Sequence, residues 1–390
     1  MQLRPGEPEE VGMSARRVRH VEQLAAGWVA QGITSALVIL VARRGAVVLH
    51  EAFGRLTPDD DAPPVQRDTL YPLSSLTKPI TATAAMLLVE DGLLGLQRPV
   101  SEYLPEFSGK GKQAVMVHHL LTHTSGLIDE DVNAHAAKKR GVVAIPPPEE
   151  SQHPWINEYL FLRYDAPLWK PPGVEMSYCD YGYMLLGEIV RRVSGQALAD
   201  FARERLFEPL GMQDTFYIVP DSVRARIVRR PLDAPSAVTL ASGAPGLGTR
   251  ELQELPCADG GVYSTAMDMA ILGQMFLNRG SYGEASILSP AAVAEMTRNQ
   301  IPGIGAQFRG EFFPEASWGL GWSIHENKRA SRDGSLYSPQ AFNLDGAGGV
   351  FLWVDPVYEI VGVYFSVVLE QSKSCRDLFM NAVTAAVVDA

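Results

Sequence analysis

The chain has 390 residues, of which 46% are apolar and 20% charged, and it carries a formal net charge of −11. Such a composition is typical of a globular protein with a large core, and the length corresponds to two or three domain-sized units or to one large enzyme with an inserted lobe. The acidic balance argues against nucleic acid and against anionic membranes as default partners.

The first residues, MQLRPGEPEEVGMS, are polar and acidic and lack the apolar core of a secretory signal. No run in the chain approaches the ~18–20 apolar residues that a membrane-spanning helix needs. We therefore expect a soluble, cytoplasmic protein, although a processed precursor would look the same. Three widely spaced cysteines without a CxxC pair, Cys179, Cys257 and Cys375, fit a reducing compartment and argue against a disulfide framework or a zinc ribbon.

A helix and a hairpin are predicted at the N-terminal end. Ser14 can cap a helix over roughly residues 15–31, because its apolar residues recur on one face. In the sequence SALVILVARRGAVVLHEAFG, residues 35–54, two β-rich runs flank Arg44-Gly45. This pattern predicts two strands joined by a tight turn.

The middle of the chain, roughly residues 75–300, is predicted to be mostly helical with long loops. The stretch YPLSSLTKPITATAAMLLVEDGLL, residues 71–94, has the apolar spacing of one buried helix. YMLLGEIVRRVSG (183–195) ends on a C-cap glycine. STAMDMAILGQMFLNRG (264–280) begins with a Ser/Thr cap and ends on a glycine.

The segment 129–173 contains too much proline for regular structure. It predicts a long ordered loop, which in a compact protein is often a lid or a binding loop. We expect its aromatic residues to wall the acyl or alcohol pocket of an active site: Trp155, Tyr159, Phe161 and Trp169.

Beyond about residue 315 the sequence again favours strands, over 318–324, 349–356 and 358–368, followed by a final helix over about 373–388. Strands at both ends of the chain with helices between them predict an α/β (α+β) fold. Its antiparallel sheet, built from both ends, is flanked by the terminal helices and carries an inserted, mostly helical lobe.

The predicted domain boundaries follow from this outline. Residues 1–70 and 305–390 would form a discontinuous sheet domain. Residues 71–304 would form the helical domain that carries Ser75, Lys78 and Tyr178.

Ser75 and Lys78 are the first candidates for chemistry. On a helix, residues three apart share a face, so the Ser75 hydroxyl and the Lys78 ammonium can meet. The start of a helix offers free N–H groups for an oxyanion, and an ammonium between apolar walls has a lowered pKa and can act as a base. S-x-x-K also occurs by chance in many chains, and a lysine that reaches out to water would explain Lys78 equally simply.

Tyr178 and Asp180, in MSYCDYGYMLLGE (176–188), precede an apolar helix. A phenol near Lys78 can relay a proton, but a core tyrosine followed by an N-cap aspartate is the commoner use of this pattern. In FNLDGAGGVFLWVDP (342–356), glycines open a strand, which would let a ligand approach the backbone and let an edge N–H complete an oxyanion hole. A bend needed for packing explains these glycines as well.

These three segments, in this order and spacing, resemble the serine β-lactamase and penicillin-binding-protein family, and most of all class C β-lactamases and family VIII carboxylesterases. The family signature is S-x-x-K, then a Tyr- or Ser-containing triplet, then a K-T-G-like strand. SSLTK, SYCDYGYMLLG and LDGAGG fill these places here, and HHLLTHTSGL (118–127), GGVYSTAMDMAILGQMFLN (260–278) and WGLGW (318–322) add support. The resemblance spans nearly the whole chain.

The resemblance implies a mixed sheet-and-helix fold with the site at the junction of the two parts. It implies that Ser75 is the acylated nucleophile, that Lys78 is a base or proton partner, and that Tyr178 is the base in acylation and deacylation. It also implies that the backbone N–H groups of Ser75 and Ala347 form the oxyanion hole. Which group deprotonates the serine differs among such enzymes and stays open at this point.

Two positions depart from the family pattern. Asp180 stands where an asparagine is usual, and a carboxylate there would hold Lys78 charged and could raise the pKa of Tyr178. Leu344 stands where Lys, His or Trp is usual, so the group that would bind a β-lactam carboxylate is missing. We expect Asp180, Leu344, Asp345, Gly346 and Trp169 to contact the substrate.

The predicted function is a serine hydrolase of the carboxylesterase type that cleaves esters with short to medium acyl chains through an acyl-enzyme. Alternatives are a β-lactamase, a D-amino-acid peptidase or amidase, an acyltransferase to an alcohol, or a catalytically silent binding module. No G-x-S-x-G elbow of an α/β-hydrolase occurs. We interpret His118, His119 and His123 as structural because no H-E-x-x-H is present, and we expect no metal, no cofactor and no partner beyond a small-molecule ester; the oligomeric state is left open.

Overall fold

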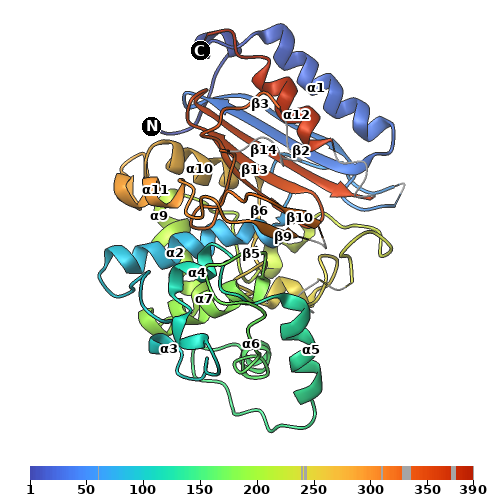
Figure 1. Ribbon diagram of the computed structural model, residues 1–390. Helices are drawn as coiled ribbons and strands as arrows, with labels where there is room; N and C mark the ends of the chain where they lie inside the picture. The colour runs from blue at the N-terminus through green and yellow to red at the C-terminus, as the bar shows by residue number, and fades with distance from the viewer. Residues whose placement is uncertain are drawn as a thin grey trace.

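The protein is described by a computed structural model that covers residues 1–59, 61–238, 240, 244–308, 311–326, 335–369 and 375–389. One sheet separates two groups of helices (Figure 1). Helices α1 and α12, from the two ends of the chain, lie on one face, and the helices from the middle of the chain lie beyond the other face.

The helices of the described part of the chain are α1 (Ala15–Ala30), α2 (Lys78–Glu90), α3 (Val100–Tyr103), α4 (Val117–Leu121), α5 (Asp129–Lys139), α6 (Pro154–Phe161), α7 (Asp180–Ser194), α8 (Leu198–Ala202), α9 (Glu208–Leu210), α10 (Ala266–Leu277), α11 (Pro290–Met296) and α12 (Arg376–Thr384). Short 3-10 and π turns add η1 (Pro8–Val11), η2 (Ser74–Thr77), η3 (Lys112–Ala114), η4 (Arg203–Phe207), η5 (Asp221–Arg226) and η6 (Glu251–Glu254).

The described strands are β1 (Arg4–Pro5), β2 (Thr34–Arg43), β3 (Ala46–Gly54), β4 (Tyr71–Pro72), β5 (Met176–Ser177), β6 (Tyr263–Ser264), β7 (Ser281–Tyr282), β8 (Ala285–Ser286), β9 (Ala306–Phe308), β10 (Glu311–Phe313), β11 (Ser323–Ile324), β12 (Phe342–Gly346), β13 (Val350–Asp355) and β14 (Ile360–Val368).

The main sheet has the strand order β1-β3-β2-β14-β13-β12-β11. It therefore combines strands from both ends of the chain, and the predicted fold class is confirmed. All neighbours are antiparallel except β1, a two-residue edge strand that runs parallel to β3 and was not predicted. The domain boundaries given above stay a prediction.

The predicted hairpin is confirmed as β2 and β3. Arg44 and Gly45 both have positive φ, 48° and 76°, and connect the paired residues Arg43 and Ala46. Two left-handed residues in a two-residue loop match the right-handed twist of the strands they join.

Strand β2 is buried on both faces, which explains its nearly continuous apolar run. Val38, Leu40 and Ala42 point into the core shared with the helices of the middle of the chain. The alternate residues, Leu37, Ile39 and Val41, point into the smaller core under α1 and α12. The sheet is thus the wall between two cores.

Two predictions about secondary structure were wrong. The segment 129–173 contains two helices, α5 and α6. The acidic first turn and basic last turn of α5 complement the helix dipole, and the proline that begins α6 is favourable at a first helical position, so neither sequence opposes a helix. The stretch 318–324 forms a strand only at its end, β11 (Ser323–Ile324); the residues before it make a turn in which Trp318 bridges Ser323 and Gly321 adopts a φ of 93°.

Gly346, the last residue of β12, lets the sheet approach the η2 turn. A Cβ atom built on Gly346 would lie 2.0 Å from the carbonyl oxygen of Leu73. No side chain fits at this distance unless the backbone moves. The glycine that was singled out in the sequence therefore sets the spacing between the sheet and the turn that carries Ser75.

We predict that Gly346→Ala lowers the free energy of unfolding by about 3 kcal/mol, because the added methyl group must displace backbone. Urea denaturation measures the change. Gly27→Ala is the matched control: it lies inside α1, its Cβ would come no closer than 3.8 Å to the side chain of Gln31, and it should be neutral or stabilising. Equal stability of the Gly346→Ala and Gly27→Ala variants would contradict the prediction.

Candidate active site

Ser75 lies in the η2 turn immediately before α2, so the predicted single helix is a 3-10 turn followed by an α-helix. The preceding residue, Ser74, has a φ of 48°, a conformation that non-glycine residues rarely adopt. Ser75 is half-buried, whereas the other residues from 71 to 80 are buried. Such a strained, well-held turn that exposes one hydroxyl is typical of functional sites.

Lys78, the first residue of α2, is completely buried, with 0% of its surface exposed. Its Nζ donates hydrogen bonds to Oδ1 of Asp180 at 2.7 Å and to the backbone carbonyl of Asp259 at 3.1 Å. The same atom lies 4.7 Å from the ring centroid of Tyr178. Lys78 therefore does not reach out to water but sits at the centre of a buried polar cluster.

The environment keeps Lys78 charged. Burial acts to lower its pKa, but the Asp180 carboxylate, assisted by Tyr178 and Asp259, raises the pKa of Lys78 well above its ordinary value. The expectation that Lys78 has a lowered pKa and can act as a base was therefore wrong. The effect of Asp180 foreseen from the altered triplet outweighs desolvation.

Tyr178 is held between Lys78, Ser75 and two rings. Burial raises the pKa of its phenol, whereas hydrogen bonds with Lys78 and Ser75 and the positive charge of Lys78 oppose this rise. The ring stacks on His123 at 4.3 Å and meets Trp318 edge-on at 6.0 Å. The structure thus brings the three predicted catalytic side chains together in one contact network, with a neutral phenol between a hydroxyl and an ammonium.

Three carboxylates surround this network. Asp180 pairs with Lys78, and Asp129 and Asp259 are buried beside them. Burial and the charge of Asp180 raise the pKa of Asp259 to about 7 and that of Asp129 to about 6. The region around Lys78 therefore holds more negative than positive groups.

The backbone N–H groups of Ser75 and Ala347 are placed at the junction of η2 and the β12–β13 turn. Within the described residues, neither N–H donates a hydrogen bond to the protein. Elements β12 and η2 pack against each other, and Ala347 follows directly after Gly346, which touches Leu73. Free donors of this kind are what an oxyanion hole requires, and their role stays a prediction.

The other residues predicted to contact substrate are placed differently. Leu344 is buried in the core on the helical side of the sheet. Asp345 points to the opposite face, where its carboxylate pairs with Arg376 of α12 at 2.8 Å. Trp169 is 40% exposed, with Lys170 lying 4.0 Å from its ring centroid. The structure therefore does not bring Asp345 to the Ser75 network.

The predicted aromatic wall is only partly exposed. Tyr159 is buried, stacks on Trp155 at 4.9 Å and lies 6.2 Å from Tyr181. Because these rings pack against the start of α7, they support the residues next to Tyr178. Their contact with a substrate stays a prediction.

His123 and Asp259 were missed as site residues. His123 was interpreted as structural; it stacks on Tyr178, and its Nδ1 accepts a hydrogen bond from the backbone N–H of Cys179 at 3.1 Å. Its position in HHLLTHTSGL was the available signal. Asp259 contributes a backbone carbonyl, and no sequence pattern predicts such a contact.

His118 and His119 form hydrogen bonds with backbone groups nearby. The described residues include no group of three or more His, Cys, Asp or Glu side chains arranged to hold a metal.

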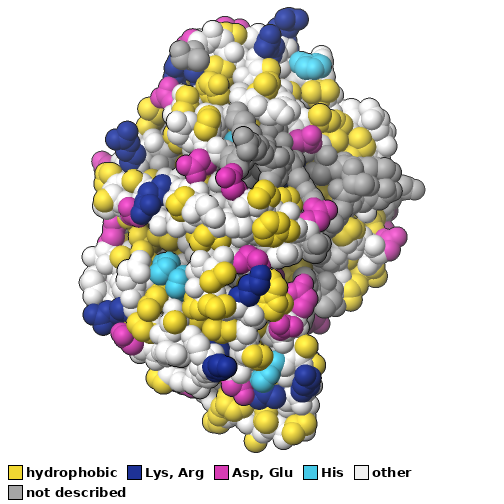
Figure 2. All heavy atoms as spheres, viewed as in Figure 1, with side chains coloured by type: hydrophobic (Ala, Val, Ile, Leu, Met, Phe, Trp, Pro, Cys, Tyr) yellow, Lys and Arg dark blue, Asp and Glu magenta, His cyan; other side chains and the backbone are white. Residues whose placement is uncertain are grey.

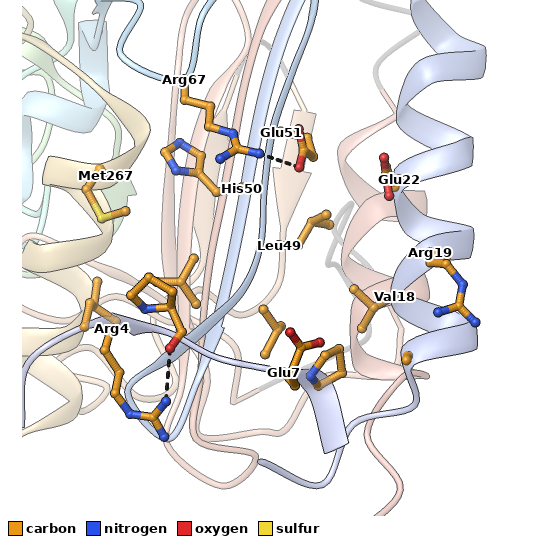
Figure 3. A pocket seen from close by; sticks show the side chains of 16 residues that line it. Arg4, Glu7, Val18, Arg19, Glu22, Leu49, His50, Glu51, Arg67 and Met267 are labelled. Atoms are coloured by element: carbon orange, nitrogen blue, oxygen red, sulfur yellow. Dashed lines mark hydrogen bonds and ion pairs between the residues drawn. The ribbon is translucent and has the colours of Figure 1, made fainter. Parts of the chain in front are cut away.

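A cavity of about 410 Å³ lies elsewhere, at the edge of the main sheet (Figure 3). Residues of α1 close one side and Met267 lies on the other, while Arg67 and Glu51 form an ion pair of 2.7 Å within it. None of the predicted site residues lines this cavity.

On the face drawn in Figure 2, the described acidic and basic side chains are scattered and form no continuous charged patch.

Comparison with known proteins gives a consistent result. The family model described as Beta-lactamase matches residues 19–379. Esterase EstB of Burkholderia gladioli is 30% identical over 303 residues, which cover 73% of this chain and 74% of that protein.

Within the part of the chain that the structure describes, no helix is both long and apolar enough to cross a membrane.

Two solved structures have the same fold. A penicillin-binding protein homologue from Caulobacter crescentus superposes with a TM-score of 0.75 at 25% identity and covers 96% of this chain and 99% of that one. A family VIII carboxylesterase superposes with a TM-score of 0.75 at 22% identity and covers 96% and 98%. The predicted resemblance is therefore confirmed.

We predict that Asp259 contributes a fall in the free energy of unfolding as the pH rises from about 4 to about 7. A carboxyl group whose pKa is higher in the folded chain binds more protons when folded, so raising the pH favours unfolding until it is ionised in both states. Asp259, with its pKa raised from 3.8 to about 7, should contribute strongly. Urea denaturation at several pH values measures this contribution: between pH 4 and 7 the free energy of unfolding of Asp259→Asn should rise relative to that of the wild type.

The control for this experiment is Asp233→Asn, which removes an exposed carboxylate. It should keep the pH dependence of the wild type. An Asp259→Asn protein with the same dependence as the wild type would contradict the assigned protonation.

Proposed function

The chain belongs to the beta-lactamase family, and we propose that it is a serine hydrolase that cleaves carboxylic esters through an acyl-enzyme on Ser75. One observation carries the proposal: the hydroxyl of Ser75, the phenol of Tyr178 and the ammonium of the buried Lys78 form one contact network. A nucleophile next to a proton acceptor that a third group orients is the arrangement that acyl transfer needs.

Tyr178 is the group we assign as the base. Lys78 is held protonated by Asp180 and cannot accept a further proton. As Oγ of Ser75 bonds to the ester carbonyl carbon, its proton passes to the oxygen of Tyr178 while the phenol gives its own proton to the leaving alcohol and the ester C–O bond breaks. Tyr178 is thus neutral before and after the step, and the charge of Lys78 stabilises the negative charge that develops on the phenol oxygen during the transfer. Water repeats these steps in reverse roles to release the acid and regenerate Ser75.

The tetrahedral intermediate carries an oxyanion that must be stabilised. We assign this role to the N–H groups of Ser75 and Ala347, which have no acceptor among the described residues. Removing one such donor typically costs about 10²–10³ in kcat. The close approach of β12 to η2 at Gly346 supports the assignment, because it brings the two donors to the same junction.

The charges around the site favour an uncharged ester over a β-lactam or a peptide with a free carboxylate. Leu344 offers no cation for a substrate carboxylate, and the acidic side chains of Asp129 and Asp180 lie close to Lys78. An anionic substrate would have to be desolvated near these carboxylates without an ion pair from the position of Leu344. Esterase EstB is one relative whose name agrees with this substrate class.

We predict that brief incubation with a p-nitrophenyl short-chain ester gives release of nitrophenol and a transient acyl adduct on the wild type. Ser75→Ala should lose the adduct and at least about 10³ of the turnover, because the nucleophile is gone. Intact-protein mass spectrometry and nitrophenol absorbance provide the two readouts. Turnover that persists in Ser75→Ala would contradict the assignment.

We also predict that a neutral ester is preferred over an anionic one of equal length. The matched pair is p-nitrophenyl valerate and mono-p-nitrophenyl glutarate, whose acyl chains differ in the terminal carboxylate. The kcat/KM of the valerate should be higher by about tenfold or more, which corresponds to about 1.4 kcal/mol. A glutarate ester cleaved equally well or better would instead favour a β-lactamase or a peptidase.

A further inference from the structure

A short segment from His123 to Asp129 binds the backbone of the Tyr178-Cys179-Asp180 triplet. Three consecutive N–H groups donate to side chains of this segment: Cys179 to Nδ1 of His123 at 3.1 Å, Asp180 to Oδ2 of Asp129 at 2.7 Å, and Tyr181 to Oδ1 of Asp129 at 3.1 Å. The N–H of Ser177 also donates to the carbonyl of His123 at 2.8 Å. The backbone is therefore held on both sides of Tyr178.

Asp129 serves here as a cap for a helix to which it does not belong. The first N–H groups of a helix lack partners within it, and helix α7 begins at Asp180. Its own N-cap residue, Cys179, makes no capping hydrogen bond with its side chain; the Cys179 thiol instead donates to Oδ1 of Asp129 at 3.3 Å. Asp129 is itself the first residue of α5, so one carboxylate joins the starts of two helices.

We propose that Asp129 is a positioning residue for the reaction at Ser75, which holds Tyr178 against the nucleophile and Asp180 against Lys78. This inference rests on the proposed function. The carboxylate of Asp180 is 2.7 Å from Nζ of Lys78, and the ring of Tyr178 stacks on His123. A shift of the triplet backbone would move both side chains at once, and a misplacement of about 1 Å in a catalytic group can cost about 10²-fold in rate.

The charge of Asp129 matters as well as its shape. All three of its hydrogen-bond partners are donors, so an ionised carboxylate accepts from each, whereas a protonated one would turn a hydrogen toward them. The groups that face it are Asp180 and Cys179 at α7, Asp259, Tyr159 of α6 and, more weakly, Arg163. Burial and Asp180 raise the pKa of Asp129 to about 6, against the three donors, so it is mainly ionised at neutral pH.

Asp129→Asn tests the inference, because it keeps the size of the side chain but replaces one acceptor by a donor. The matched control is Asp268→Asn. Asp268 in α10 is also buried, also has a pKa raised to about 6 by burial, and accepts hydrogen bonds from Asp214 and Thr215 at 2.8 Å each rather than from the triplet. Both variants lose a buried carboxylate that accepts a backbone hydrogen bond, but only one loses it at the triplet.

The first readout is the rate at which a fluorophosphonate probe labels Ser75, followed by intact mass. In this reaction the Oγ–P bond forms, the P–F bond breaks, and the serine proton leaves through Tyr178. The rate therefore reports activation of the nucleophile without any assumption about the natural substrate. The second readout is kcat and KM for p-nitrophenyl valerate, and the third is the midpoint of thermal unfolding.

We expect Asp129→Asn to slow labelling and kcat by about tenfold or more with KM changed less than about threefold, while Asp268→Asn stays within about twofold of the wild type in rate at a similar loss of thermal stability. Labelling and turnover of Asp129→Asn at the wild-type rate would overturn the inference. If Asp129→Asn does not fold, Asp129→Ser, whose hydroxyl can accept one of the bonds, takes its place and the same tenfold threshold decides.

The outcome for Asp129 can be separated from the outcome for the proposed function. A wild type that is labelled at Ser75 but does not cleave the ester would overturn the ester assignment and leave Asp129 to be judged by labelling alone. An Asp129→Asn variant that is labelled and cleaves the ester as fast as the wild type would overturn only the role of Asp129. A Ser75 that is neither labelled nor acylated would overturn both.

Discussion

The buried ion pair between Lys78 and Asp180 is the interaction on which the candidate site depends. Removing one member of such a pair leaves an uncompensated buried charge and typically costs about 3–5 kcal/mol. The pair joins the first residues of α2 and α7, so it fixes the two helices that follow directly after Ser75 and Tyr178 in the chain. It also fixes the protonation of the site, because a charged Lys78 can stabilise negative charge on the oxygen of Tyr178 but cannot accept a proton.

The surrounding structure serves to keep this pair dry and aligned. Asp259 supplies the second acceptor for Lys78 through its carbonyl, and Asp129 holds the backbone of Asp180. On the sheet side, Gly346 allows β12 to approach the turn in which Ser74 adopts its unusual conformation. The sheet comes from the two end segments of the chain, and most of the helices come from its middle. These two parts of the structure therefore meet at Ser75.

Much of this architecture could be predicted from the sequence. The β2–β3 hairpin, helix α7 with Gly195 as its left-handed C-cap, and the strands β13 and β14 each carry strong local signals, and the order of the motifs indicated the family. Helices α5 and α6 were missed because prolines between them masked favourable helix ends. The orientation of Asp345 was missed because the direction of a side chain on a strand depends on register, which the motif alone does not give.

The chemistry of the site was harder to predict than its composition. Ser75, Lys78 and Tyr178 stand in recognisable motifs, but the pKa of Lys78 depends on whether burial or Asp180 dominates, and only the distance of 2.7 Å decides this. The roles of Asp129 and of the carbonyl of Asp259 arise from contacts across 51 and 181 positions of the chain, for which a single sequence contains no signal.

The most direct test is the ionisation of Lys78 itself. The chain has only eight lysines, so protein grown with ¹³C-labelled lysine gives few side-chain signals, and Lys78→Arg assigns the one of interest. A charged Lys78 paired with Asp180 should show an unchanged ¹³Cε shift from pH 6 to beyond the ordinary lysine pKa of about 10.4. A titration of this signal near neutral pH would contradict the assignment and would make Lys78, rather than Tyr178, the base.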